Sequence, residues 1–193
     1  MEDVTIRPPA PGDEDALCRV HIRAWQTAYR GIVSDEFLDG MTVEGRIERW
    51  RERIANVDGG QFPFVAETPD AQGRPVMVGF AWSGREGDGF AGPDGARYDG
   101  EVYAIYLLAE WRGRGVGHLL MAASARALID AGHHSVVIWV LKDNATARRF
   151  YEALGGVLAG EKPITIGQTD LLEVAYGWPD ARRLLASASR SAE

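Results

Sequence analysis

Strand-like and helix-like hydrophobic patterns alternate along the whole chain. Short runs rich in β-branched and aromatic residues predict strands at residues 4–7, 62–67, 75–83, 101–108, 135–140, 157–158 and 171–176. Apolar residues at helical spacing predict helices between Asp13 and Gly31, over residues 43–55 and 118–131, and between Asn144 and Gly155. This order of strands and helices predicts an α/β fold, with layers around one central sheet.

The first predicted helix is apolar on two sides. One stripe at helical spacing consists of Leu17, Val20, Ala24 and Ala28. A second, rotated stripe consists of Ile22, Trp25 and Tyr29. Such a helix packs on the core with one side and can face a ligand with the other.

Two segments are expected to lack regular structure. Residues 84–100 contain six glycines and predict a mobile loop. The residues that follow Pro179 are rich in Ala, Ser and Arg, which predicts a flexible tail over residues 180–193. We therefore expect one domain over residues 1–179.

Composition narrows the class of protein. The chain has 193 residues, of which 46% are hydrophobic, so one self-supporting domain is expected. A single cysteine, Cys18, excludes an intramolecular disulfide framework. The longest apolar run is too short to cross a bilayer, and the acidic first residues carry no apolar signal core. We expect a cytoplasmic protein with no membrane partner, and the net charge of −7 argues against a nucleic-acid partner.

The most informative segment is Trp-Arg-Gly-Arg-Gly-Val-Gly-His at residues 111–118, between a predicted strand and a predicted helix. Gly113, Gly115 and Gly117 let the backbone turn tightly and approach a ligand. Their N–H groups, together with those of the helix start, form an anion site, to which Arg112 and Arg114 add positive charge. Residues 111–193 carry ten basic and eight acidic side chains, a net charge of +2. A pyrophosphate group suits this site.

Three nucleotide-binding patterns compete for this segment. The phosphate loop of NTPases requires Gly-x-x-x-x-Gly-Lys-Ser/Thr, which does not occur in the chain. The dinucleotide pattern Gly-x-Gly-x-x-Gly fails because its third position falls on His118 or Leu120. The pattern Arg/Gln-x-x-Gly-x-Gly/Ala is satisfied by Arg112, Gly115 and Gly117.

The context of this pattern resembles the GNAT superfamily of acyl-CoA N-acyltransferases. Five features follow one another in family order: the strand at 101–108, the loop at 112–117, a Leu/Met/Ala-rich helix, the strand at 136–140, and Asn144 to Tyr151 with Gly155 beyond. The chain departs from many members in having Ala109 instead of Pro and Gly156 instead of Phe. The resemblance implies a mixed, mostly antiparallel central sheet, splayed in the middle and flanked by helices, with acetyl-CoA in the gap between residue 108 and the 136–140 strand.

The resemblance also implies which residues bind the donor. The pyrophosphate would lie on the backbone of Arg112, Gly113, Arg114, Gly115, Val116 and Gly117. The pantetheine arm would pair with the main chain of Leu107 and Leu108, one of which would supply the oxyanion N–H group. Asn144 would bond this arm, although a helix cap explains it equally well.

The resemblance further implies catalytic and acceptor residues. Glu101, eleven residues before Arg112, is the candidate general base; otherwise it is an ordinary acid at the start of a strand. Tyr151 is the candidate general acid toward the CoA sulfur; otherwise it is a core aromatic. Trp25, Tyr29 and Tyr103 are candidates for the acceptor pocket, where acids in residues 35–36 would suit a cationic amine.

These residues predict an N-acetyltransferase that transfers an acetyl group from acetyl-CoA to a primary amine, in a small molecule rather than a protein, directly in a ternary complex. The alternative is a non-catalytic acyl-CoA-binding sensor or interaction module of the same fold. Metal is not expected, because the four histidines do not form a ligand pattern. Family members often dimerise, so a second copy of the chain is a candidate partner.

Overall fold

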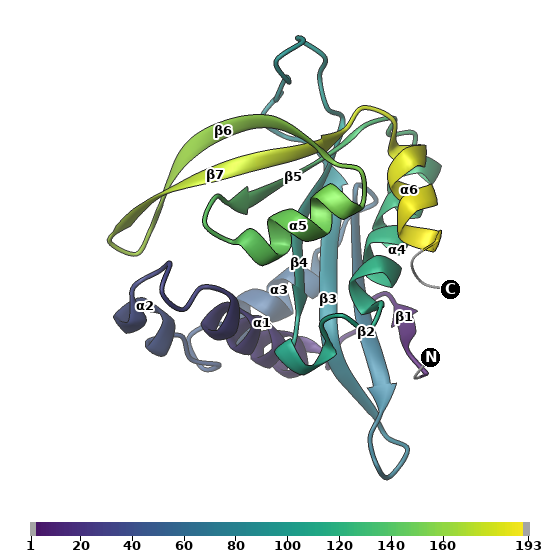
Figure 1. Ribbon diagram of the computed structural model, residues 1–193. Helices are drawn as coiled ribbons and strands as arrows, with labels where there is room; N and C mark the ends of the chain where they lie inside the picture. The colour runs from purple at the N-terminus through teal and green to yellow at the C-terminus, as the bar shows by residue number, and fades with distance from the viewer. Residues whose placement is uncertain (1–2, 191–193) are drawn as a thin grey trace.

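The computed structural model describes residues 3–190 as one seven-stranded sheet with helices on both faces (Figure 1). The strands follow the order β1-β2-β3-β4-β5-β7-β6. Their bounds are β1 Thr5–Arg7, β2 Gln61–Pro69, β3 Pro75–Arg85, β4 Gly100–Leu107, β5 Val136–Leu141, β6 Val157–Ile166 and β7 Thr169–Trp178. The helices are α1 Glu14–Ala28, α2 Asp35–Asp39, α3 Ile47–Ala55, α4 Val116–Asp130, α5 Ala145–Ala153 and α6 Ala181–Arg190, with a 3₁₀ turn at Ala109–Trp111.

The sheet is splayed between β4 and β5. All other neighbouring strands pair antiparallel, whereas β4 and β5 run parallel. Their register contains two rungs, Gly100↔Val136 and Glu101↔Val137. Beyond these rungs the strands separate, so the backbone of β4 is left open toward β5. This confirms the fold class expected from the sequence.

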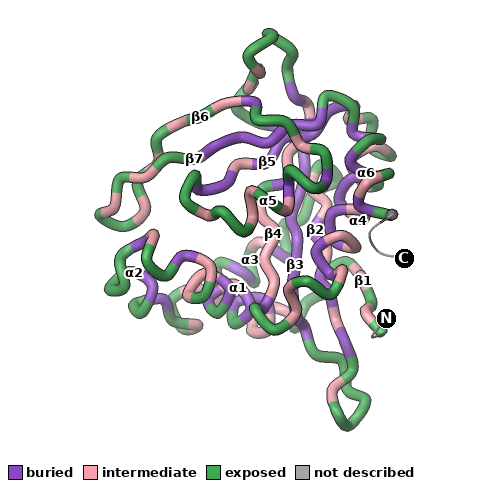
Figure 2. The backbone as a smooth tube through the Cα atoms, viewed as in Figure 1, coloured by how far each residue is buried: buried purple, intermediate pink, exposed green. Residues whose placement is uncertain are grey.

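The two faces of the sheet carry separate cores. On one face, α1 and α3 pack on β2 and β3 around large buried side chains such as Leu17, Phe80 and Trp82. On the other, α4, α5 and α6 pack around side chains such as Leu128 and Trp178. Figure 2 shows the buried backbone concentrated in β3, α4 and β7, with exposed segments at the hairpin tips. Each core contains side chains from strands on both sides of the splay, such as Val102 of β4 and Ile138 of β5 in the second core.

The expected flexible tail is wrong for residues 181–190. They form α6, which packs on α4, and the side chains of Ala181, Leu184 and Ala188 are at most 1% exposed. The N–H of Ala181 also donates to the carbonyl of His134 at 2.8 Å. The apolar positions recur at helical spacing, so the amphipathic pattern outweighs the small, polar composition. Residues 191–193 of the expected tail lie outside the described part.

The last two strands are longer than the sequence predicted. β6 and β7 form a ribbon that extends past β5 toward α2 (Figure 1). At its tip Gly167 has φ +61°, and an added Cβ would lie 2.7 Å from the ring of Phe37. The ribbon tip therefore touches α2 and closes one side of the splay.

The glycine-rich segment between β3 and β4 is ordered by its own contacts, contrary to the expected mobile loop. The carboxylate of Glu86 accepts hydrogen bonds from the N–H groups of Asp88, Gly89 and Phe90. Phe90 stacks on Tyr98 at 5.7 Å between ring centroids, and meets Trp139 of β5 edge-on at 4.9 Å. The loop thus packs against β5 near the closed end of the splay, where Gly100 and Glu101 of β4 pair with β5.

The rings of Tyr98 and Phe90 pack directly against glycines of β6 and β7, where a side chain would leave no space. A Cβ at Gly177 would overlap the phenol of Tyr98, and one at Gly160 would lie 2.9 Å from Phe90. We expect Gly177→Ala to destabilise the fold by about 1–3 kcal/mol through overpacking, a fall of several degrees in Tm. Thermal unfolding measures it. Gly87→Ala, where nothing lies within 4 Å of the added Cβ, is the matched control. Equal Tm values for the two variants would contradict the packing.

Candidate active site

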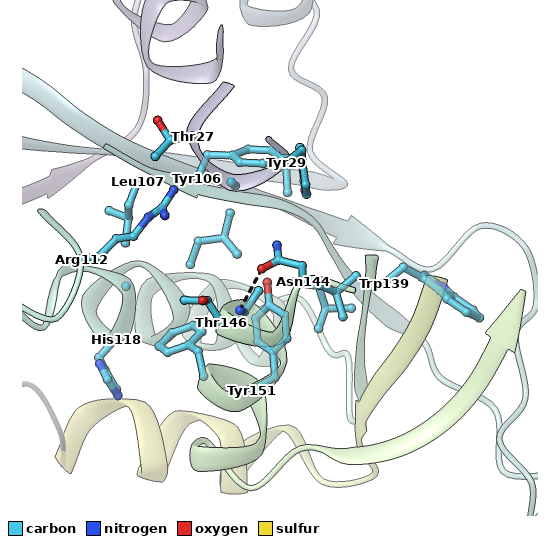
Figure 3. A pocket seen from close by; sticks show the side chains of 18 of the residues that line it. Thr27, Tyr29, Tyr106, Leu107, Arg112, His118, Trp139, Asn144, Thr146 and Tyr151 are labelled. Atoms are coloured by element: carbon cyan, nitrogen blue, oxygen red, sulfur yellow. Dashed lines mark hydrogen bonds between the residues drawn. The ribbon is translucent and has the colours of Figure 1, made fainter. Parts of the chain in front are cut away.

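A cavity of about 440 Å³ lies in the splay between β4 and β5 (Figure 3). Its walls come from α1, β4, the loop before α4, β5 and α5. The residues that line it are Thr27–Tyr29, Tyr103–Leu107, Arg112, Gly113, Gly115, Gly117, His118, Ile138–Val140, Asn144, Thr146, Ala147, Phe150 and Tyr151. The cavity is therefore long and mostly apolar, with charged and polar groups at particular points.

One end of the cavity is the glycine loop. Gly113 and Gly115 have φ +73° and +83°, a left-handed conformation that glycine adopts without strain. The carbonyl of Gly115 accepts hydrogen bonds from the N–H groups of His118 and Leu119, so the amides of Val116 and Gly117 precede the first hydrogen bonds of α4. A Cβ at Gly117 would lie 3.2 Å from Phe150 and 3.3 Å from Leu107, which shows how closely α4 approaches β4 and α5. The start of α4 thus presents main-chain N–H groups at the cavity wall, an arrangement that favours the binding of an anion.

Two arginines flank this loop. Arg112 lines the cavity beside Leu107 (Figure 3). The Arg114 guanidinium lies 5.0 Å from the centroid of Trp111, and this residue is not part of the lining. Arg112 is therefore the cation of the motif that faces the cavity.

The register of β4 distinguishes Leu107 from Leu108. The N–H of Leu108 donates to the carbonyl of Val78 at 3.0 Å, so it is committed to the sheet. Its side chain is buried in the α1 core. In an antiparallel pair, consecutive N–H groups point to opposite sides, so the N–H of Leu107 points to the open β5 side. Of the two amides expected to contact a donor, that of Leu107 therefore faces the gap and that of Leu108 does not.

Tyr151 and Asn144 lie together on the α5 wall. The ring of Tyr151 is 5% exposed, and Figure 3 shows its hydroxyl pointing into the cavity beside Asn144. Burial raises the pKa of this phenol, so it stays protonated at neutral pH. The Asn144 side-chain oxygen accepts from the N–H of Ala147 at 3.2 Å, so it also caps α5.

Glu101 lies at the closed end of the splay, outside the lining residues. It is the last β4 residue paired with β5. Burial, and next the negative charge of Glu86, raise its carboxyl pKa to about 7, while Lys162 opposes the shift. A carboxyl with this pKa can accept and release a proton near neutral pH.

The α1 wall is aromatic. Tyr29 and Tyr106 line the cavity, and their hydroxyl oxygens are 3.3 Å apart. Tyr103 also lines it, and its hydroxyl donates to the carbonyl of Arg85. Trp25 does not line the cavity, contrary to the expectation from the sequence. It packs against the α1 core, with its ring centroid 6.3 Å from that of Tyr106.

The acids expected to draw a cationic amine are engaged elsewhere. Asp35 forms an ion pair with Arg30 at 2.9 Å, and Asp39 with the same guanidinium at 2.7 Å. Glu36 is exposed on α2. Any attraction for a cation must therefore come from another part of the site.

Several lining residues were missed by sequence reasoning. They are Thr27, His118, Trp139, Thr146 and Phe150. Trp139 carried one signal, a single aromatic ring in an otherwise aliphatic strand. Within residues 3–190, His, Cys, Asp and Glu side chains do not gather in threes as metal ligands. None of the described helices is long and apolar enough to cross a membrane.

The chain is similar in sequence to known acetyltransferases. The model of the acetyltransferase (GNAT) family matches residues 22–156. The N-acetyltransferase YuaI of Bacillus subtilis (strain 168) is 32% identical over 190 residues, covering 97% of this chain and 99% of that protein. A mycothiol acetyltransferase of Nocardiopsis dassonvillei is 32% identical over 155 residues, covering 80% of this chain and 42% of that protein.

Solved structures share the fold. The acetyltransferase YncA of Salmonella typhimurium, whose structure contains its cofactor acetyl-CoA, has a TM-score of 0.63 and 20% identity. The match covers 92% of this chain and 94% of that one.

Proposed function

The chain belongs to the GNAT acetyltransferase family, and from that premise we propose that it transfers the acetyl group of acetyl-CoA to a primary amine of a small molecule. One observation supports this proposal most. A single cavity joins the glycine loop to a buried tyrosine, and a carboxyl of raised pKa, Glu101, lies outside this lining at the closed end of the same splay. The structural relative with bound acetyl-CoA supports the choice of donor.

The donor would enter along the open edge of β4. Its pyrophosphate would bind the amides at the start of α4 and the charge of Arg112. Its arm would pair with the exposed main chain of β4 as an added strand does. The N–H of Leu107 would stabilise the thioester oxygen as negative charge develops there.

Transfer requires the nitrogen to lose two protons and the sulfur to gain one. An alkylamine with a pKa of about 10.4 is protonated at pH 7, and the Glu101 carboxylate would accept the first proton, directly or through water. The amine nitrogen then forms a bond to the acetyl carbon and releases its second proton to solvent, and the carbon–sulfur bond breaks. Tyr151 would donate its proton to the leaving sulfur and regain one from solvent.

Direct transfer is favoured over an acetyl-cysteine intermediate. Cys18, the only cysteine, is fully buried among α1 core residues, and its Sγ contacts the Val43 carbonyl at 3.9 Å. It does not line the cavity.

Binding and turnover test the proposal. Calorimetric titration should give micromolar, salt-sensitive binding of acetyl-CoA and no binding of NADH. An amine screen by CoA-thiol release should then find an acceptor. Donor binding without turnover on any amine would favour the alternative, a non-catalytic acyl-CoA-binding module; no donor binding would overturn both.

The pH profile gives a further expectation. Only the ionised Glu101 accepts a proton, so kcat/KM should fall as pH decreases through about 7, where burial and Glu86 place this pKa. Lys162, Asp88 and Glu173 also act on this carboxyl. Rates from pH 5.5 to 9 measure the break. Glu101→Gln, in which only the acceptor amine titrates, should lack the break near pH 7, and a break in both proteins would assign it to another group.

A further inference from the structure

A lysine of the chain already occupies one face of a cavity-lining ring. The Nζ of Lys162 on β6 lies 4.1 Å from the centroid of Trp139. At this distance an ammonium group is held by the ring's quadrupole. In Figure 3, Trp139 lies at the opposite end of the labelled residues from Arg112 and His118. Trp139 therefore lies at the end of the cavity away from the glycine loop.

The strand register explains how Lys162 reaches this ring. Lys162 pairs with Glu173 across the β6–β7 ladder, and Glu173 pairs with Leu141 across the β7–β5 ladder. Directly paired residues share a face of the sheet, and alternate residues of β5 do too. Leu141, Trp139 and Val137 thus share the face with Lys162, and Glu101, paired with Val137, does so as well. One face presents the ring, the lysine and the candidate base.

The charges around the ring favour a cation. Glu101 and Glu173 are both half-buried, and within the described residues neither forms an ion pair or a hydrogen bond through its carboxylate. Lys162 likewise forms no ion pair with a described carboxylate, although it stabilises the ionised form of both acids. The ammonium thus rests on the ring beside two acids without being locked to either.

We propose that Trp139 is the platform for the ammonium of the acceptor, and that Lys162 holds this place until a substrate displaces it. This inference rests on the proposed function and names its substrate class. The group that fits the ring is a primary ammonium on an unbranched methylene chain. The acceptors are therefore linear alkylamines, such as an alkyl diamine or a lysine-type side chain, rather than arylamines or amines on a branched carbon.

Kinetics with n-pentylamine as the probe test this proposal. Lys162→Met should lower the KM of n-pentylamine about fivefold, because the tethered competitor is gone, while kcat stays unchanged. Trp139→Leu should raise this KM by a similar factor. Both are compared on the upper plateau of each variant's own kcat/KM–pH profile, above its Glu101 break, so that the effect of Lys162 on the pKa of Glu101 does not enter the comparison.

Lys142→Met is the matched control. Lys142 also lies on this half of the sheet, but its ammonium pairs with Glu161 at 2.7 Å on the exposed surface. This variant removes the same charge without freeing the ring, so its KM should equal that of the parent. An unchanged or higher KM in Lys162→Met, or an equal decrease in Lys142→Met, would overturn the place-holder role.

Two further measurements separate this inference from the proposed function. Aniline and isopropylamine should have a higher KM than n-pentylamine, and Lys162→Met should not lower it. Equal improvement for all amines would refute the linear-chain class while leaving acetyl transfer established. Failure of every amine to release CoA thiol would instead refute the proposed function. Thermal unfolding of each variant checks that the ribbon is intact.

Discussion

Replacing Glu101 by glutamine should lower kcat for acetyl transfer about 100-fold, with the dissociation constant of acetyl-CoA unchanged. Glutamine keeps the shape of the side chain but cannot accept a proton. The closed end of the splay holds this carboxyl half-buried near Glu86, so its pKa of about 7 suits proton transfer at neutral pH. Steady-state kinetics and calorimetric titration on the same samples measure the two quantities.

The control for this prediction is another carboxylate of the same sheet. Glu161→Gln removes an acid of β6 that is exposed and paired with Lys142, and kcat should change less than twofold. A Glu101→Gln enzyme with the parent's kcat would show that the amine loses its proton to water or to another residue, and Glu101 would then be an ordinary acid at the start of a strand.

The donor end of the site is largely predictable from the sequence because its chemistry is local. The glycines at 113 and 115 adopt the left-handed conformation that the alternating pattern calls for. The same short segment supplies the helix start and the cavity-facing Arg112. A ligand that binds main-chain amides leaves a local signature in which residue spacing and backbone conformation coincide.

Other parts of the site depend on strand register, which the sequence does not reveal. Whether Leu107 or Leu108 offers its N–H to the gap is decided by the pairing of Leu108 with Val78 on β3. A shift of one residue would exchange the two. The position of Lys162 over Trp139 depends in the same way on the β6–β7 and β7–β5 ladders. These residues are far apart in sequence and share no motif.

The raised pKa of Glu101 also has a non-local origin. Among the charged groups that shift this pKa, Glu86 has the largest effect. Glu86 lies in the glycine-rich loop, which the sequence predicts as mobile. In the structure, the Glu86 carboxylate accepts hydrogen bonds from three backbone N–H groups of this loop. Glycines of β6 and β7 leave space for the rings of Phe90 and Tyr98. A glycine-rich composition can thus belong to a well-packed loop. Glycine makes an isolated chain flexible, but it also leaves space for neighbouring aromatic rings.

Tyr151→Phe should lower kcat at least tenfold, with donor binding and Tm nearly unchanged. The substitution removes only the hydroxyl, which points into the cavity beside Asn144, and leaves the ring in the α5 core (Figure 3). Because burial keeps this phenol protonated, it can supply a proton when the carbon–sulfur bond breaks. Pre-steady-state CoA release and calorimetry measure the two effects.

A second phenol of the same cavity separates acid catalysis from a general loss of polarity. Tyr103 lies on β4, whereas Tyr151 lies on α5. Tyr103→Phe removes a hydroxyl that donates to the carbonyl of Arg85. It should change kcat much less than Tyr151→Phe does, because it is not placed to protonate the sulfur. The leaving group provides the sharper criterion: an acetyl thioester of a more acidic thiol needs less protonation, so the deficit of Tyr151→Phe should shrink with such a donor. A deficit that is the same for both thioesters would show that Tyr151 positions the donor and does not protonate the sulfur.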